Sequence, residues 1–265
     1  MDATQNSKQD HNEKYSRYVC CALNIITPQN FDTLLENTLA LIGDDKNKMD
    51  VIIDMIFKNS SSSSLYSEVY SKLCASILEK YQRDSIDSFE HIQRRILLNY
   101  EENVSKIVLE DRGKVPDEER YAIFCTLAFV AQMFKQKIVP LDKMQRFIDK
   151  LLPSETQPQQ SLDFKLDCFI KLVEIVGKSL EELDKQYTDT IFDRIDKLTK
   201  AESLLGTRLY FLLLRVTELR ENNWTPRLES LKPVTIDKIR REVEDEIERR
   251  NQEIIFWRKQ RKAST

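Results

Sequence analysis

The chain has 265 residues, enough for one large domain or two small ones. Hydrophobic residues make up 41% and charged residues 32%, so the chain can fill a core and is too apolar to be disordered throughout. It holds only 4 glycines, and folds with many strands and tight turns need more, because hairpin turns use positive φ. The net charge of -3 excludes a globally basic nucleic-acid binder, so any RNA contact needs a local patch.

The first 14 residues are polar and carry both charges, which predicts a flexible leader. They have no apolar stretch long enough for a signal peptide, and no later run approaches a membrane span. The five cysteines are odd in number and form no C-x-x-C pair, which favours reduced structural thiols. We therefore expect a cytoplasmic protein that contacts no membrane.

The helical pattern begins at Tyr15. Thr27-Pro28 predicts a helix start, because threonine caps with its hydroxyl and proline suits the first turn. Val51–Phe57 and a stretch from residue 65 to 81 with apolar residues at near-fourfold spacing predict two further helices. The run Ser60–Ser64 between them is expected to be a solvated loop, with phosphorylation of this loop as an alternative.

The ends of the later helices are predicted from prolines, capping residues and one glycine. A helix is predicted over Ile92–Val108, and Pro116 and Pro140 each predict a helix start. Residues 152–161 are rich in proline and glutamine and predict a loop. Apolar residues on one side predict a helix from Phe164 that stops at Gly177. Helices over 187–198 and 207–220 follow, and an amphipathic helix runs from 235 to about 260.

These segments give about ten or eleven helices in antiparallel pairs of roughly 40 residues, the period expected of HEAT-type solenoids. The period comes from helix and loop lengths, since the sequence shows no repeating signature. We predict an all-α HEAT-repeat α-solenoid crescent of about five pairs, plus the C-terminal amphipathic helix. The expected organisation is a leader over 1–14, a repeat domain over 15–228, and a linker with a charged helix over 229–265.

Catalytic chemistry finds little support in the sequence. His11 lies in the leader, and His91 has no serine or cysteine motif around it. No set of His, Cys or Asp has metal-ligand spacing, and no glycine-rich phosphate loop occurs. We therefore assign no catalytic residue, metal or cofactor, and expect a non-enzymatic protein that acts through its surfaces.

Five segments in a shared order carry a family resemblance. They are Leu23–Phe31 (LNIITPQNF), Val51–Lys58 (VIIDMIFK), Arg94–Asn99 (RRILLN), Phe129–Lys135 (FVAQMFK) and Arg208–Arg227, which ends in ENNWTPR. Their order and spacing resemble the middle domain of eukaryotic translation initiation factor 4 gamma, over about residues 18–246. The resemblance implies a five-repeat HEAT crescent that binds both lobes of a DEAD-box RNA helicase of the initiation factor 4A class and so speeds its cycle.

The resemblance also implies helicase-binding residues. By position these are Leu23, Ile26, Phe31, Phe211, Arg220, Trp224 and Arg227. For the apolar ones the alternative is a place in the core of an amphipathic helix. Trp224 is expected to staple the last helix pair, and Arg227 to face the helicase.

The charged tail offers an RNA-binding hypothesis. Trp257 is followed by Arg258, Lys259, Arg261 and Lys262, which could meet phosphates while the indole stacks on a base. The alternative is an amphipathic helix that is packed on the solenoid or solvated. Messenger or structured RNA and other initiation factors are thus further expected partners. Two other functions stay open: an adaptor of the same fold family in messenger decay, splicing or nuclear cap binding, and an RNA-binding module without helicase affinity.

Overall fold

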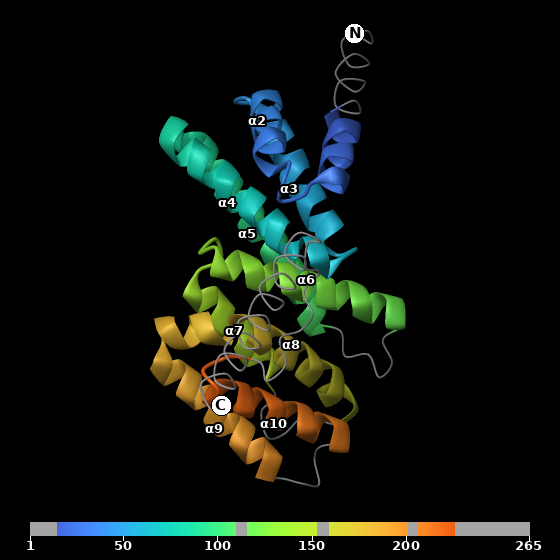
Figure 1. Ribbon diagram of the computed structural model, residues 1–265, viewed down its shortest axis with the longest axis vertical. Helices are drawn as coiled ribbons and strands as arrows, with labels where there is room; N and C mark the ends of the chain where they lie inside the picture. Colours follow the sequence, from blue (N-terminus) through green and yellow to red (C-terminus); the bar gives the residue numbers. More distant parts are fainter. Residues whose placement is uncertain (1–14, 110–115, 153–158, 201–205, 226–265) are drawn as a thin grey trace, which may run out of the picture. The chain divides into compact units, whose positions relative to one another are not determined.

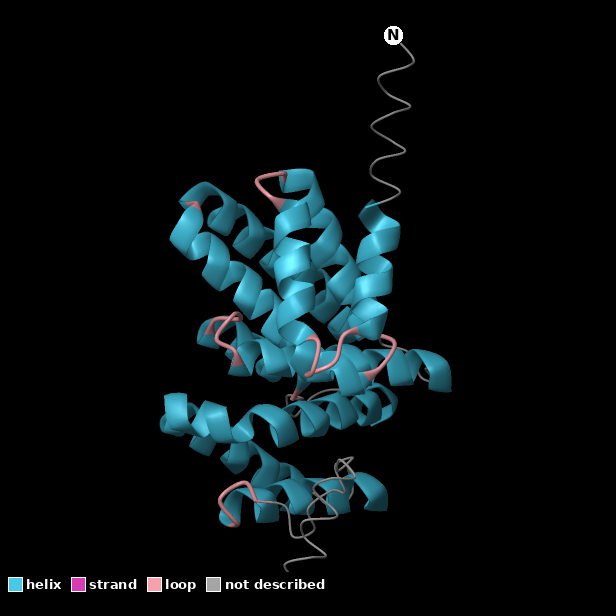
Figure 2. Ribbon diagram, turned by 45° about the horizontal axis from the view of Figure 1, so that its top comes forward, coloured by secondary structure: helices cyan, strands magenta, loops and turns pink. Residues whose placement is uncertain are grey.

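Helix-forming residues dominate the described part of the chain. The computed structural model describes residues 15–109, 116–152, 159–200 and 206–225, and in these ranges it contains ten α-helices, one short 3-10 helix and no strand (Figure 2). The predicted all-α class is confirmed. After a helix over residues 15–25, the elements are α2 (Phe31–Ile42), α3 (Lys46–Ser60), the 3-10 helix η1 (Ser64–Tyr66), α4 (Ser67–Asp84), α5 (Ile86–Leu109), α6 (Asp117–Lys135), α7 (Leu141–Leu151), α8 (Gln159–Leu183), α9 (Lys185–Lys200) and α10 (Thr207–Glu221).

Most of the helices pack on the helix two places further along the chain, and many also pack on their neighbour. The even-numbered helices form one row, in which α2 contacts α4, α4 contacts α6, α6 contacts α8 and α8 contacts α10. The odd-numbered helices form the other row, in which α3 contacts α5 and α5 contacts α7. Figure 1 shows this succession from α2 and α3 to α9 and α10. Such stacking of pairs is the arrangement of an α-solenoid, as predicted.

Hydrogen bonds between repeats supply the period that the sequence does not show. Tyr70 Oη donates to the main-chain oxygen of Leu23 (3.1 Å), 47 residues earlier. Tyr100 Oη donates to the main-chain oxygen of Lys143 (3.1 Å), 43 residues later. Buried hydroxyls need such partners, because an unpaired polar group is costly in an apolar core. These tyrosines therefore fix the register between successive repeats at about one repeat length.

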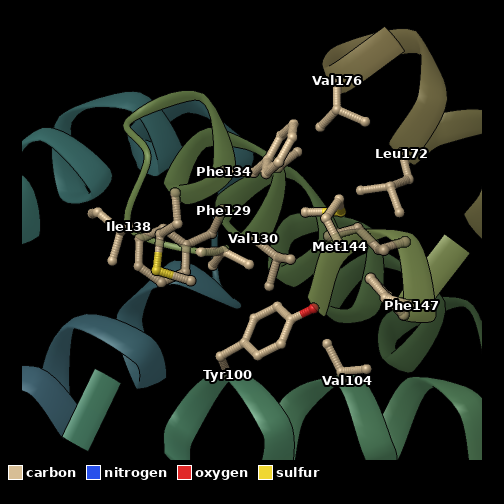
Figure 3. Close-up of a cluster of buried hydrophobic side chains, with 14 of the residues drawn as sticks. Tyr100, Val104, Phe129, Val130, Phe134, Ile138, Met144, Phe147, Leu172 and Val176 are labelled. Atoms are coloured by element: carbon tan, nitrogen blue, oxygen red, sulfur yellow. The ribbon is translucent and has the colours of Figure 1, made fainter. Parts of the chain in front are cut away.

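One hydrophobic core runs continuously through the stacked helices. Figure 3 shows its central part, where Tyr100 and Val104 of α5 point toward side chains of α6 and α7, while Leu172 and Val176 of α8 close the other side. Phe129 of α6 is fully buried and meets Phe57 of α3 edge to face, with ring centroids 5.1 Å apart. Large rings packed in this way bury extensive apolar area, so the repeats share one core.

Two predicted boundaries are wrong. Thr27-Pro28 does not start a helix; α2 begins at Phe31. The Thr27 amide donates to Asn30 Oδ1 (2.7 Å) and the Asn30 amide to Thr27 Oγ1 (3.4 Å), so the two side chains close a turn ahead of the helix. Gly177 does not stop a helix either, because α8 continues to Leu183. Residue 177 is glycine because the Trp224 ring occupies the space that a side chain would need there.

The predictions made from Pro116, Pro140 and the serine run agree with the structure more closely. Pro116 and Pro140 immediately precede α6 and α7, as predicted. The serine run does join two helices, since α3 ends at Ser60 and the 3-10 helix begins at Ser64. Ser63 caps that short helix through its Oγ, so part of the predicted loop is ordered by its own hydroxyls.

The chain divides into two units, Met1–Trp224 and Thr225–Thr265. The predicted leader, the predicted boundary after residue 228 and the predicted C-terminal helix all lie outside the described residues. Of the helices that are described, none has the length and apolarity needed to cross a bilayer.

Candidate functional site

Several ionisable side chains of the described ranges tie one helix to another. His91 Nε2 lies 2.9 Å from Asp50 Oδ1, and Arg95 Nε donates to Asp54 Oδ1 (2.8 Å), so α5 is tied to α3. No group of three His, Cys, Asp or Glu side chains in the ranges given above could hold a metal ion. Burial raises the pKa of the Cys74 thiol to about 12, which keeps it protonated and unreactive.

The structure places Leu23, Ile26 and Phe31 in the core. All three side chains are buried, and the main-chain oxygen of Leu23 accepts the Tyr70 hydrogen bond. The alternatives for these residues were a helicase contact and a place in the core, and Leu23 lies in the core. Ile26 and Phe31 also line a surface groove. A direct helicase contact by these three residues stays a prediction.

This N-terminal groove lies between the turn before α2 and the start of α4. Its volume is about 360 Å³, and most of its lining is apolar: Ile26, Pro28 and Phe31 come from the turn and α2, and Leu65, Tyr66 and Val69 from η1 and α4. Thr27 and Glu68 also line it. Lys72 also lines it and lies with its ammonium 4.5 Å from the centroid of the Phe31 ring. An apolar groove with a charged edge is the form in which proteins accept an anchor side chain of a partner.

Leu65 and Tyr66 are the site residues that the sequence pattern missed. Leu65 opens the stretch whose apolar spacing predicts a helix, yet it lies in η1 and its side chain is 77% exposed. The α-helix begins only at Ser67, so Leu65 is not on the buried face of that helix. An apolar Leu-Tyr pair directly after five serines was the signal that could have found it.

Among the helicase-binding predictions that fall in the described ranges, Phe211 is the one whose side chain is exposed. It lies near the start of α10 and is 62% exposed. The Tyr210 ring meets it edge to face at 5.5 Å between centroids, which limits its motion. An exposed, fixed phenyl ring on a helix is a suitable anchor for a protein partner.

Arg220 and Trp224 form a closed cluster with the preceding repeat. Arg220 Nη2 donates to Glu181 Oε1 (2.8 Å) and also pairs with Asp189. The Trp224 indole N–H donates to Glu181 Oε2 (2.6 Å), and its ring meets Phe192 edge to face at 5.9 Å. The Arg220 guanidinium, and then the Trp224 N–H, hold the pKa of the Glu181 carboxyl below its ordinary value.

The Trp224 ring also explains Gly177. A Cβ on residue 177 would lie 2.0 Å from the indole ring, far inside van der Waals contact. Trp224 itself has φ 60°, a left-handed conformation that costs energy for a tryptophan. Its amide donates to the main-chain oxygen of Leu219 (2.7 Å). The cluster therefore staples the end of the last helix pair, as expected for Trp224.

Arg227 and the predicted RNA-binding residues Arg258, Lys259, Arg261 and Lys262 lie outside the described residues. Their roles stay predictions. Among the described residues, the segments that carry the family resemblance thus contribute to two exposed apolar features, the N-terminal groove and the α10 surface around Phe211.

Stacked helix pairs with exposed apolar anchors define a helical-repeat protein of the scaffold class. The MIF4G domain family matches residues 17–223, and the chain belongs to that family. It is 27% identical to eukaryotic translation initiation factor 4 gamma of Dictyostelium discoideum, covering 85% of this chain and 20% of that protein. It is 26% identical to eukaryotic translation initiation factor 4 gamma 1 of Mus musculus, covering 87% of this chain and 16% of that protein.

The chain thus spans about a fifth or less of the length of these two relatives. A solved structure shares the fold: the MIF4G domain of Trypanosoma cruzi translation initiation factor EIF4G5. It matches with a TM-score of 0.54 at 19% identity, over 80% of this chain and 97% of that one.

Proposed function

We propose that this chain is a cytoplasmic translation-initiation scaffold that binds a DEAD-box RNA helicase of the initiation factor 4A class and stimulates it. The names of the relatives support the initiation role. The resemblance of Leu23–Phe31 and Arg208–Arg227 to the helicase-binding family supports the partner. RNA binding by the charged tail is an auxiliary part of the proposal.

The single observation that carries the proposal is the pair of exposed apolar features on the repeat unit. A helicase of this kind has two lobes that must close on ATP and RNA. A scaffold speeds that cycle only if it binds the closed arrangement more tightly than the open one, which requires contact with both lobes. The N-terminal groove supplies one contact, and the Phe211 surface on α10 supplies the other.

Leu65→Asp tests the groove. The substitution places a carboxylate at the edge of an apolar groove, and desolvating it opposes binding. Because Leu65 is 77% exposed, the fold should tolerate the change. Titration calorimetry with the purified helicase should show affinity reduced by about tenfold or more, as expected for loss of an anchor residue.

Ile86→Asp is the matched control, since Ile86 is 73% exposed at the first residue of α5 and lies outside the groove. It should leave the affinity unchanged. Equal affinities for Leu65→Asp and the unsubstituted chain would remove the groove from the proposal. RNA binding with no detectable helicase binding would instead favour the RNA-binding module.

A further inference from the structure

The consecutive serines at the junction of α3 and η1 differ in how their hydroxyl groups are held. The hydroxyls of Ser60 and Ser61 each donate to a main-chain oxygen of the preceding helical turn at 2.7 Å. Ser63 Oγ accepts a hydrogen bond from the amide two residues later (3.4 Å). The side chains of Ser62 and Ser64 are exposed, and their hydroxyls make no hydrogen bond to another described residue. A group added to either of these two hydroxyls therefore breaks no hydrogen bond within the described part of the chain.

The segment that holds these two serines can open at low cost. From residue 61 to residue 66 no side chain is buried, whereas Ser60 and Ser67 at its two ends are buried. A segment with few buried contacts opens more readily than the core around it. An enzyme that modifies a serine needs such a segment, because the hydroxyl has to enter the active site of that enzyme. Residues 61–66 can meet this need while the helices on either side stay packed.

The Ser64 hydroxyl lies beside the N-terminal groove. Ser64 directly precedes Leu65, whose 77% exposed side chain lines the groove, and the Cα atoms of neighbouring residues are about 3.8 Å apart. The groove lining carries one carboxylate, from Glu68, and one ammonium group, from Lys72. These two charges balance. A phosphate group on Ser64 adds a charge of about -2 near pH 7 and makes this edge of the groove negative.

We infer that Ser64 is a phosphorylation site whose phosphate prevents the helicase from docking on the N-terminal groove. A protein kinase joins Ser64 Oγ to the γ-phosphorus of ATP. The bond from that phosphorus to the β–γ bridging oxygen breaks, ADP leaves, and the hydroxyl proton passes to a base of the kinase. The added phosphate opposes docking, because a partner that covers Leu65 also removes water from the phosphate next to it. The inference rests on the proposed function and names a regulation of the same groove.

The first experiment maps the modification on the full chain. The folded chain is incubated with isotope-labelled ATP and an extract of the cells from which it comes, and labelled peptides are identified by mass spectrometry. Label is expected on Ser64. Ser64→Ala should remove this label and leave helicase affinity unchanged, because the hydroxyl makes no hydrogen bond to another described residue. Absence of label on Ser64 in the unsubstituted chain would overturn the inference.

The second experiment measures the effect of the phosphate on docking. Phosphoserine is incorporated during synthesis at position 64 or, as the matched control, at position 62, which is also an exposed serine but lies three residues before Leu65. Titration calorimetry with the purified helicase should show affinity lowered by about tenfold or more for position 64, and much less for position 62. Treatment with a phosphatase should restore the affinity, and circular dichroism checks that each protein is folded.

Two results of the second experiment would contradict the inference. One is equal affinity of the unmodified chain and the chain with phosphoserine at position 64. The other is an equal loss of affinity for positions 62 and 64, which would indicate a general effect of charge. If the unmodified chain binds no helicase, the proposed function fails and this regulation fails with it, whether or not Ser64 carries label.

Discussion

Because Gly177 lies against the Trp224 ring, we predict that Gly177→Ala destabilises the protein, whereas helix propensity alone predicts that it stabilises the protein. Glycine inside a helix is about 1 kcal/mol less favourable than alanine, so propensity alone predicts that Gly177→Ala stabilises the protein. The structure predicts the reverse, because the new methyl would lie 2.0 Å from the indole ring and force it out. The displaced ring loses its hydrogen bond to the Glu181 carboxylate, worth about 1.5–3 kcal/mol, and its edge-to-face contact with Phe192, worth about 0.5–1.5 kcal/mol.

The net result for Gly177→Ala is a loss of about 1–3 kcal/mol in the free energy of unfolding, after the propensity gain is subtracted. Urea unfolding followed by far-ultraviolet circular dichroism measures it. A double-mutant cycle sharpens the test. In a Trp224→Ala background the methyl meets no ring, and Gly177→Ala should then stabilise by up to about 1 kcal/mol. If Gly177→Ala is neutral or stabilising in the otherwise unsubstituted chain, the reasoning is refuted.

Two further outcomes follow from ionisable groups. The folded-state pKa of Glu181 lies below its unfolded value of about 4.5, so the stability it contributes is present above that pH and is lost as pH falls through the folded pKa. When the free energy of unfolding is measured at descending pH, Glu181→Gln should therefore lose less stability than the unsubstituted chain. Equal losses in the two proteins would count against the cluster. Cys21 is exposed whereas Cys74 is buried with a pKa of about 12, so a thiol reagent near pH 8 should label Cys21 in the folded protein and Cys74 only after unfolding. Rapid labelling that persists in Cys21→Ser and maps to Cys74 would contradict that assignment.

Helix starts were predictable where a proline sets them. Pro116 and Pro140 define starts because a missing amide hydrogen costs nothing in the first turn. At Thr27-Pro28 the error was local, because the side chains of Thr27 and Asn30 close a turn before α2. At Gly177 a distant residue decides. Nothing near Gly177 in sequence reveals that the Trp224 ring, three residues beyond the end of α10, covers this position of α8. A glycine required by tertiary contact looks the same in sequence as a glycine that ends a helix.

For the candidate groove, the sequence indicated one of the chain segments that border it but not which side chains are exposed. Family resemblance led to the segment Leu23–Phe31, which does border the groove. Periodicity cannot separate an apolar residue that fills the core from one that faces a partner, since both occupy an amphipathic helix. Leu65 was missed because its exposure depends on one turn of 3-10 helix.

The two-contact scaffold is tested most directly by the RNA-dependent ATPase rate of a 4A-class helicase in the presence of this chain. The account predicts that the unsubstituted chain raises the rate. Leu65→Asp or Phe211→Ala alone should abolish most of that increase, because each removes contact with one lobe. Leu183→Ala, at a residue exposed to a similar extent to Phe211, should leave the increase intact. The two-contact account would be contradicted if the unsubstituted chain did not change the ATPase rate, or if the increase survived each of these two substitutions.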